Sequence, residues 1–238
     1  MSKPVRQGRT NCSRILAELK SLANPANVAG MARYGINPTN TLGVSIPRLR
    51  AMAKEIGRDH ALALELWKSG IHEARILAGL IDDPVLVSEA QLDRWARDFD
   101  SWDVCDLVCS NLFDKTPFAH AKAIAWSSRG EEFVKRAGFV LMAALAVHDK
   151  KAPAGSFRTF LPIIEREASD ERNFVKKAVN WALRQIGKRS RELNKAAIAT
   201  ARRIQKIDSK SARWIASDAL RELASGAVQK RLKLPRGR

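Results

Sequence analysis

The sequence contains little cysteine, proline and glycine. Its 238 residues include three cysteines, nine prolines and 13 glycines. Three cysteines cannot all pair, and Cys105 and Cys109 lie one helical turn apart, so we expect buried, reduced thiols rather than a disulfide framework. A closed zinc site needs about four ligands. Because no histidine lies near these cysteines at a suitable spacing, we predict neither a metal nor a cofactor.

Long apolar runs and nucleotide-binding motifs are also absent. No segment approaches the roughly 20 apolar residues that a transmembrane helix requires. Residues 1–11 are polar and basic and lack the apolar core of a signal peptide, so we expect a flexible N-terminal segment, no membrane partner and a cytoplasmic location. There is no Walker loop, nucleophile elbow or dinucleotide fingerprint, which disfavours nucleotide-driven and covalent chemistry.

The residues that are abundant favour helices. Alanine, leucine, arginine and lysine dominate, 45% of residues are hydrophobic, and the alternation typical of strands is scarce. Apolar periodicity and helix-breaking residues predict about twelve helices in six pairs. Their expected ranges are 12–24, 46–56, 59–68, 71–81, 88–98, 101–113, 116–128, 131–148, 157–168, 172–187, 190–205 and 208–225.

The charge is large and unevenly distributed. The net charge is +17, and residues 172–238 carry 19 Lys or Arg against four Asp or Glu, whereas residues 82–114 carry nine acids and two bases. A basic region of this size is typical of proteins that bind polyanions. Nucleic acid is the first expectation, an acidic membrane surface the second, and a solvated basic surface the alternative without a ligand.

Two short segments recur along the chain. Phe133–Ala137 is repeated as Phe174–Ala178 at an offset of 41 residues, and Ala182–Arg184 as Ala219–Arg221 at an offset of 37. Helix pairs that recur about every 40 residues are typical of HEAT-like repeats.

These repeats predict an all-α protein, an α-solenoid of about six HEAT-like helix pairs with a concave basic face. We expect one solenoid domain over residues 12–228, a basic C-terminal tail over 229–238, and a monomer, since such repeats bury their own core. A compact helical bundle without a concave face is the alternative.

The helix expected at 101–113 carries the most informative pattern. Val104, Leu107, Val108 and Leu112 share one arc, while Trp102, Asp106 and Cys109 lie on the opposite arc with Asp103 beside them. Because Trp102 and Asp106 are four residues apart, they lie one turn above the other. An aromatic wall with an anion at its edge suits a cationic or sugar-like ligand.

Two later helices carry basic residues in unusual surroundings. Arg136 lies in an almost wholly apolar helix, so it either pairs with an aspartate of the acidic 82–114 segment or contacts a phosphate. In the helix expected at 172–187, one face carries Lys177, Trp181, Arg184 and Lys188. Bases interleaved with an aromatic can neutralise phosphates and contact a sugar or base. A core position for Trp181 is the alternative.

Together, several motifs resemble the AlkD-like DNA alkylation repair family over most of residues 12–225. They are Met31-Ala32-Arg33-Tyr34, Leu42-Gly43-Val44-Ser45, Leu49-Arg50, Leu66-Trp67, His72-Glu73-Ala74-Arg75, Trp102-Asp103-x-x-Asp106, Lys135-Arg136 and Lys177-Ala178-x-x-Trp181-x-Leu183-Arg184. The resemblance implies a solenoid that wraps double-stranded DNA and a glycosylase that removes cationic N3- and N7-alkylated purines.

The resemblance also assigns roles to residues of this chain. It implies that Asp106 is the catalytic carboxylate, that Trp102 and Trp181 flank the sugar of the lesion, and that Arg136 holds a backbone phosphate. Tyr34 is a further candidate for the same DNA-binding cleft, and Asp103, beside Trp102 on the helix, is also predicted to contact DNA. It implies no metal, no redox cofactor and no obligatory protein partner, and a nucleoid association when DNA is bound.

Two positions depart from the family pattern and point to a narrower range of lesions. Asn173 stands where a second aromatic is expected, and Gln185 stands where the family often has an acid. Two other functions remain open on the sequence. One is a non-catalytic protein that binds distorted DNA or structured RNA, and the other is a solenoid scaffold for a protein partner.

Overall fold

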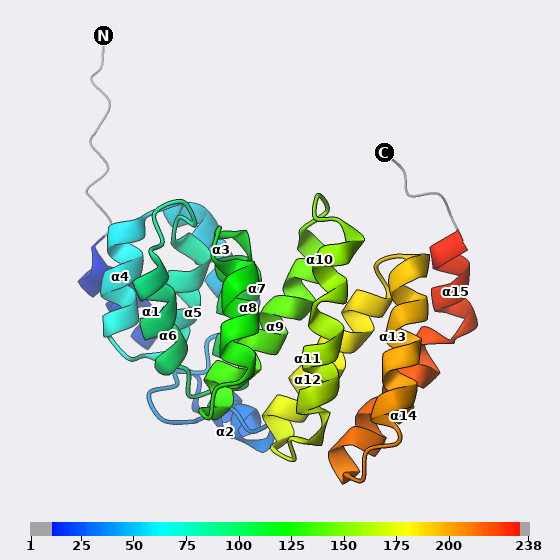
Figure 1. The fold of residues 1–238 in the computed structure, drawn as a ribbon. Helices are drawn as coiled ribbons and strands as arrows, with labels where there is room; N and C mark the ends of the chain where they lie inside the picture. The colour runs from blue at the N-terminus through cyan, green and yellow to red at the C-terminus, as the bar shows by residue number, and fades with distance from the viewer. Residues whose placement is uncertain (1–10, 234–238) are drawn as a thin grey trace. The chain divides into compact units, whose positions relative to one another are not determined.

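A computed structural model describes residues 11–233 of the chain (Figure 1). Within these residues every regular element is a helix, which confirms the predicted all-α class. The chain divides into two compact units, unit 1 up to Val87 and unit 2 from Ser88 onward. The sequence had predicted one continuous domain over residues 12–228. No helix among residues 11–233 is long and apolar enough to cross a membrane.

Unit 1 holds the first five helices. They are α1 (Cys12–Ser21), α2 (Pro25–Arg33), α3 (Ile46–Ile56), α4 (His60–Lys68) and α5 (His72–Ile81). The α5 helix packs on α3 and α4. Its Glu73, almost wholly buried, accepts hydrogen bonds from the backbone N–H groups of Leu42 (2.9 Å) and Gly43 (2.6 Å), which fixes the loop that precedes α3. The guanidinium of Arg75 lies over the ring of Trp67, so this residue has a structural role within unit 1.

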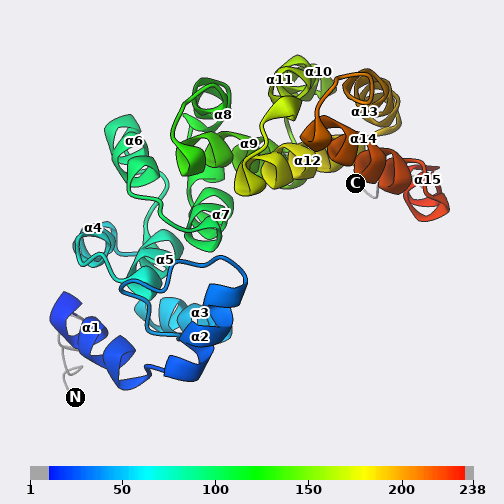
Figure 2. The ribbon, with the colours of Figure 1, turned by 90° about the horizontal axis from the view of Figure 1, so that it is seen from below.

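Unit 2 holds the remaining helices. They are α6 (Glu89–Arg97), α7 (Trp102–Asn111), η1 (Phe113–Lys115), α8 (Ala119–Ser127), α9 (Glu132–His148), α10 (Ala154–Arg158), α11 (Phe160–Arg166), η2 (Glu167–Ser169), α12 (Asn173–Gly187), α13 (Arg191–Ile204), α14 (Lys210–Leu223) and α15 (Gly226–Lys233). Seen from below, they form two rows (Figure 2). In one row α7, α9, α12 and α14 pack in succession, and in the other α8, α11 and α13 cover them.

The repeated segments occupy equivalent places in unit 2. Phe133–Ala137 and Phe174–Ala178 begin the neighbouring helices α9 and α12, and the rings of Phe133 and Phe174 lie 5.6 Å apart. Ala182–Arg184 and Ala219–Arg221 lie in the second halves of the neighbouring helices α12 and α14. The two offsets therefore mark consecutive helices of the same row.

The close approach of α8 and α9 depends on a glycine. A Cβ atom at Gly138 would lie 2.7 Å from the backbone nitrogen of Ser127 and 3.0 Å from the carbonyl oxygen of Ala123. Because these are backbone atoms of α8, no side-chain movement could make room for them. The α9 helix is buried from Val134 to Ala146, on all its faces, as its apolar sequence predicts.

Three short helices were not expected from the sequence. The α2 helix begins at Pro25, because proline fits the first turn of a helix, where its missing N–H costs nothing. The side chain of Asn24 caps this helix by accepting a hydrogen bond from the N–H of Asn27. Pro153 likewise directly precedes α10 as its N-cap residue. The α15 helix extends to Lys233 and so includes the beginning of the predicted tail.

The predicted terminal segments lie largely outside the described residues. Residues 1–10 of the expected flexible N-terminus and residues 234–238 of the expected tail are among those not described. Asn11 caps α1, because its side chain accepts a hydrogen bond from the N–H of Arg14 at 2.8 Å.

Candidate functional site

The α7 helix places Trp102 and Asp106 where the sequence analysis expected them. Trp102 is the first residue of the helix and is partly exposed, and Asp106 follows one turn later with 18% of its side chain exposed. Asp103 points inward instead: it is 9% exposed and accepts a 2.8 Å hydrogen bond from the hydroxyl of Ser101. Little of the Asp103 carboxylate is therefore accessible for a contact with DNA. Cys109 does not share this outward position: it is fully buried, as is Cys105, which confirms the buried, reduced thiols predicted for this pair.

Asp106 and Arg136 form a bidentate ion pair between α7 and α9. Arg136 donates from Nε to Oδ1 of Asp106 at 2.9 Å and from Nη2 to Oδ2 at 2.8 Å. Its Nη1 donates to the carbonyl oxygen of Phe174, in the first turn of α12, at 2.5 Å. Of the two alternatives left open for Arg136, the ion pair with an aspartate of the 82–114 segment is therefore present. With 5% of the residue exposed, only an edge of the guanidinium can meet a phosphate.

Burial and charge act in opposite directions on Asp106. Burial has the larger effect and raises the pKa of the carboxyl above its ordinary value of 3.8, while the guanidinium of Arg136 limits that rise. Burial also disfavours the charged form of Arg136, but the carboxylate keeps the pKa of the guanidinium above its ordinary value. The pair thus holds an anion in a largely desolvated place, where it interacts strongly with any developing positive charge.

Trp181 and Lys177 lie on the outward face of α12. Trp181 is partly exposed, and among residues 11–233 its indole makes no hydrogen bond or ring contact. Lys177, one turn earlier, is exposed. The rings of Phe133 and Phe174 are in tilted contact, and the backbone carbonyl of Phe174 accepts the hydrogen bond from Arg136. The sequence pattern gave neither ring a role, although Phe174 is linked to Asp106 through Arg136.

The other two predicted DNA-binding bases of α12 are engaged with acids of α14. Arg184 lies 2.8 Å from Oε2 of Glu222 and 3.3 Å from Oδ2 of Asp218, and Lys188 lies 2.7 Å from Oε1 of Glu222. Both bases are only partly exposed. Their charges are largely neutralised within unit 2, which leaves Lys177 as the exposed base of this set.

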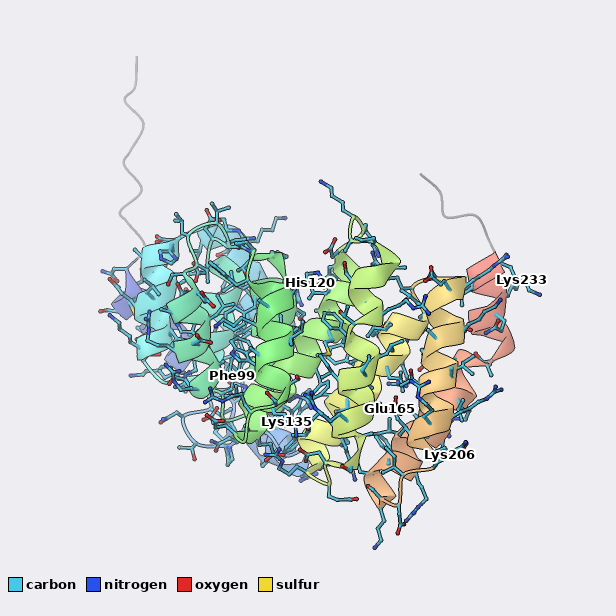
Figure 3. The ribbon with its side chains drawn as sticks, in the orientation of Figure 1. Phe99, His120, Lys135, Glu165, Lys206 and Lys233 are labelled. Atoms are coloured by element: carbon cyan, nitrogen blue, oxygen red, sulfur yellow. The ribbon has the colours of Figure 1, made fainter. Side chains whose placement is uncertain are left out.

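A second buried ion cluster lies beside Arg136. Lys135, labelled in Figure 3, lies 2.5 Å from Oε2 of Glu167 and 2.8 Å from Oδ2 of Asp170. Burial opposes ionisation here, yet the hydrogen bonds from Lys135 and the neighbouring arginines lower the pKa of both carboxyls. Consecutive bases of α9 thus serve different partners: Lys135 ties α9 to the segment before α12, and Arg136 ties it to α7 and α12.

The remaining predicted residue, Tyr34, belongs to unit 1. It follows α2 and is 76% exposed, so its ring is available at the surface of that unit. Within the described part of the chain, no group of three or more His, Cys, Asp or Glu side chains could hold a metal ion.

Comparison with known proteins connects this geometry to a family. The model of a family described as DNA alkylation repair enzyme matches residues 15–223. A solved structure described as "a new family of proteins related to the HEAT-like repeat DNA glycosylases with affinity for branched DNA structures" is 20% identical, covers 90% of this chain and 95% of its own, and gives a TM-score of 0.74. This likeness concerns the fold and confirms the predicted HEAT-like architecture. No curated protein matches the chain.

Proposed function

The chain belongs to the DNA alkylation repair enzyme family, and from that premise we propose that it binds double-stranded DNA and hydrolyses the N-glycosidic bond of cationic N3- and N7-alkylated purines. The observation that carries the proposal is the partly exposed carboxylate of Asp106, oriented by two hydrogen bonds from Arg136. Trp102 and Trp181 are proposed to flank the sugar.

The chemistry requires little more than a positioned anion. An alkylated purine already carries a positive charge, so it leaves as a neutral base without protonation by the enzyme. As the bond breaks, positive charge develops on the sugar in an oxocarbenium-like transition state. A fixed carboxylate in a desolvated site stabilises that charge more than it stabilises the neutral sugar of the substrate. Water then adds to the sugar carbon and its proton leaves to the carboxylate or to solvent.

Arg136 is proposed as a positioning residue in this scheme. By binding both carboxylate oxygens it fixes the orientation of Asp106, and by binding the carbonyl of Phe174 it holds α7, α9 and α12 in one arrangement. Lys177 is proposed to contact a backbone phosphate. Arg184 and Lys188 are weaker proposals, because an incoming phosphate must compete with Glu222. Tyr34 is proposed to contact DNA from unit 1.

The decisive experiment is release of 7-methylguanine from methylated duplex DNA. We expect release by the wild type and none above background by Asp106→Asn, with DNA affinity retained. Asp93→Asn is the matched control, because it also removes one partner of an ion pair, that with Lys122, but Asp93 belongs to α6 and not to the candidate site. Release by Asp106→Asn at the wild-type rate would overturn the role of Asp106.

A non-catalytic role in binding DNA is the second candidate. It is favoured by the engagement of both oxygens of Asp106 with Arg136, which leaves the carboxylate less free to act on a substrate. Tight, salt-dependent binding without base release by the wild type would support this function and refute the glycosylase. The same binding experiments test the proposed monomeric state, through the stoichiometry of the complex.

A further inference from the structure

Trp214 presents its indole to solvent in the basic part of unit 2. It lies on α14 and is 41% exposed, whereas the other tryptophans among residues 11–233 are buried or partly buried. The ammonium group of Lys176, on the neighbouring helix α12, lies 5.8 Å from the centroid of its ring. Tryptophan combines a large apolar ring with a polar N–H and is enriched at interaction sites, where a ligand covers the ring.

The surroundings of Trp214 are positively charged. Along the same face of α14, Lys210 precedes it by one turn and Arg221 follows it by two turns, and both are exposed. The acids of this region are bound by other groups, and Asp208, just before α14, is paired with Arg213. Asp218 is paired with Arg184 and Arg221 and accepts a hydrogen bond from Asn180, and Glu171 accepts hydrogen bonds from Ser209 and from the backbone of Ser211.

The α12 helix joins this surface to the candidate site. At about 100° per residue, Lys176 lies at one edge of the outward arc of α12, Lys177 lies in the middle, and Trp181 lies at the other edge. The first edge faces α14, because Lys176 reaches Trp214, and the other edge carries Phe174, whose ring meets Phe133 of α9. The row seen in Figure 2 therefore carries aromatic rings on three successive helices with two lysines between them.

We propose that Trp214 and Lys176 form a binding site for an unpaired DNA base, with the ring stacked on the base and the ammonium on an adjacent phosphate. The positive charge around Trp214 favours a polyanion as ligand. The exposed ring favours an unpaired base, since bases within a duplex are already stacked on both faces. This proposal depends on the proposed function in one respect only, namely that the protein binds DNA. The site takes a single-stranded flank or junction strand, not the alkylated purine.

The test compares the binding of two undamaged DNAs by fluorescence anisotropy. One is a blunt duplex and the other is the same duplex with a short unpaired tail. We expect Trp214→Ala to lower affinity for the tailed duplex by about 5- to 100-fold and to leave affinity for the blunt duplex nearly unchanged. Trp214→Phe should retain most of the affinity, because a smaller ring still stacks.

Matched lysine variants separate the local contact from general charge. Lys176→Gln should weaken binding to the tailed duplex, while Lys195→Gln, an exposed lysine of α13 in the other row, removes the same charge and should have little effect. Equal losses for both DNAs, or no loss with Trp214→Ala, would overturn the proposal. Excision of 7-methylguanine from blunt duplex should be retained in Trp214→Ala, so failure of the glycosylase and failure of this site give different results.

Discussion

Replacing Arg136 by methionine would remove the cation that both oxygens of Asp106 bind. The substitution keeps an unbranched side chain of similar length in α9, so the apolar packing changes little. It leaves the carboxylate, whose side chain is 18% exposed, without a positive partner. Breaking one side of a buried ion pair costs about 3–5 kcal/mol. Since Asp106 is partly exposed, we expect about 3 kcal/mol, which corresponds to a fall in Tm of roughly 6–12 °C for a chain of this size.

A double-mutant cycle with Asp106→Asn isolates the interaction itself. Urea denaturation would give the free energy of unfolding of the wild type, the two single variants and the double variant. If the pair is as close and desolvated as its 2.8 and 2.9 Å hydrogen bonds indicate, the double variant should be more stable than the sum of the single losses predicts, by about 2–3 kcal/mol. An interaction energy below about 0.5 kcal/mol would refute the reasoning, because exposed pairs contribute only that much.

The loss of stability in Arg136→Met should depend on pH. A carboxyl whose pKa is raised by folding adds stability below its unfolded pKa, and this stability is lost as the pH rises through the raised value. Without Arg136 the pKa of Asp106 rises further. The loss of stability in Arg136→Met should therefore be small near pH 3, where Asp106 is protonated, and should grow toward pH 7. Excision by the variant should also need a higher pH than excision by the wild type.

Three further predictions concern single positions. Lys135→Met should lower the free energy of unfolding by about 3 kcal/mol at pH 7 and by less at pH 3. Folding lowers the pKa values of Glu167 and Asp170, so these carboxyls add stability above about pH 4, and this stability is lost as the pH falls. Equal losses at both pH values in urea denaturation would contradict this. Gly138→Ala should lower the free energy of unfolding by about 1–3 kcal/mol in the same assay. Gly130→Ala is its control, because a Cβ atom added there meets nothing within 4 Å. Trp181→Ala should slow single-turnover excision by about 5- to 100-fold and Trp181→Phe much less, since a ring persists; equal rates in all three proteins would exclude a contact with the lesion.

The sequence predicted the long helices well and the short ones poorly. The α3 helix was placed at its observed bounds, and α9 and α12 within one residue, because their apolar periodicity extends over several turns. The α2 and α10 helices were missed because Pro25 and Pro153 were treated as stops. Proline disrupts the interior of a helix but fits its first turn, so a proline in the sequence can mark either the end or the start of a helix.

The sequence predicted which residues form the candidate site, but not which of them bind one another. The helical arc placed Trp102 and Asp106 off the core, and the apolar surroundings of Arg136 showed that it needed an anion. Which anion it binds depends on the packing of α7 against α9, which no local pattern encodes. The engagement of Lys188 by Glu222 escaped notice for the same reason, since the two residues are 34 positions apart.

The burial of α9 on every face has a consequence for motion. Its amides from Val134 to Ala146 are covered by α7, α8 and α12, so they can exchange with solvent deuterium only when neighbouring helices separate. The α15 helix ends the row and has one buried residue, Val228, so it can open while α9 stays packed. Hydrogen exchange should therefore be slowest in α9 and faster in α15, and the row of helices that carries Asp106 and Arg136 should stay assembled while α15 opens.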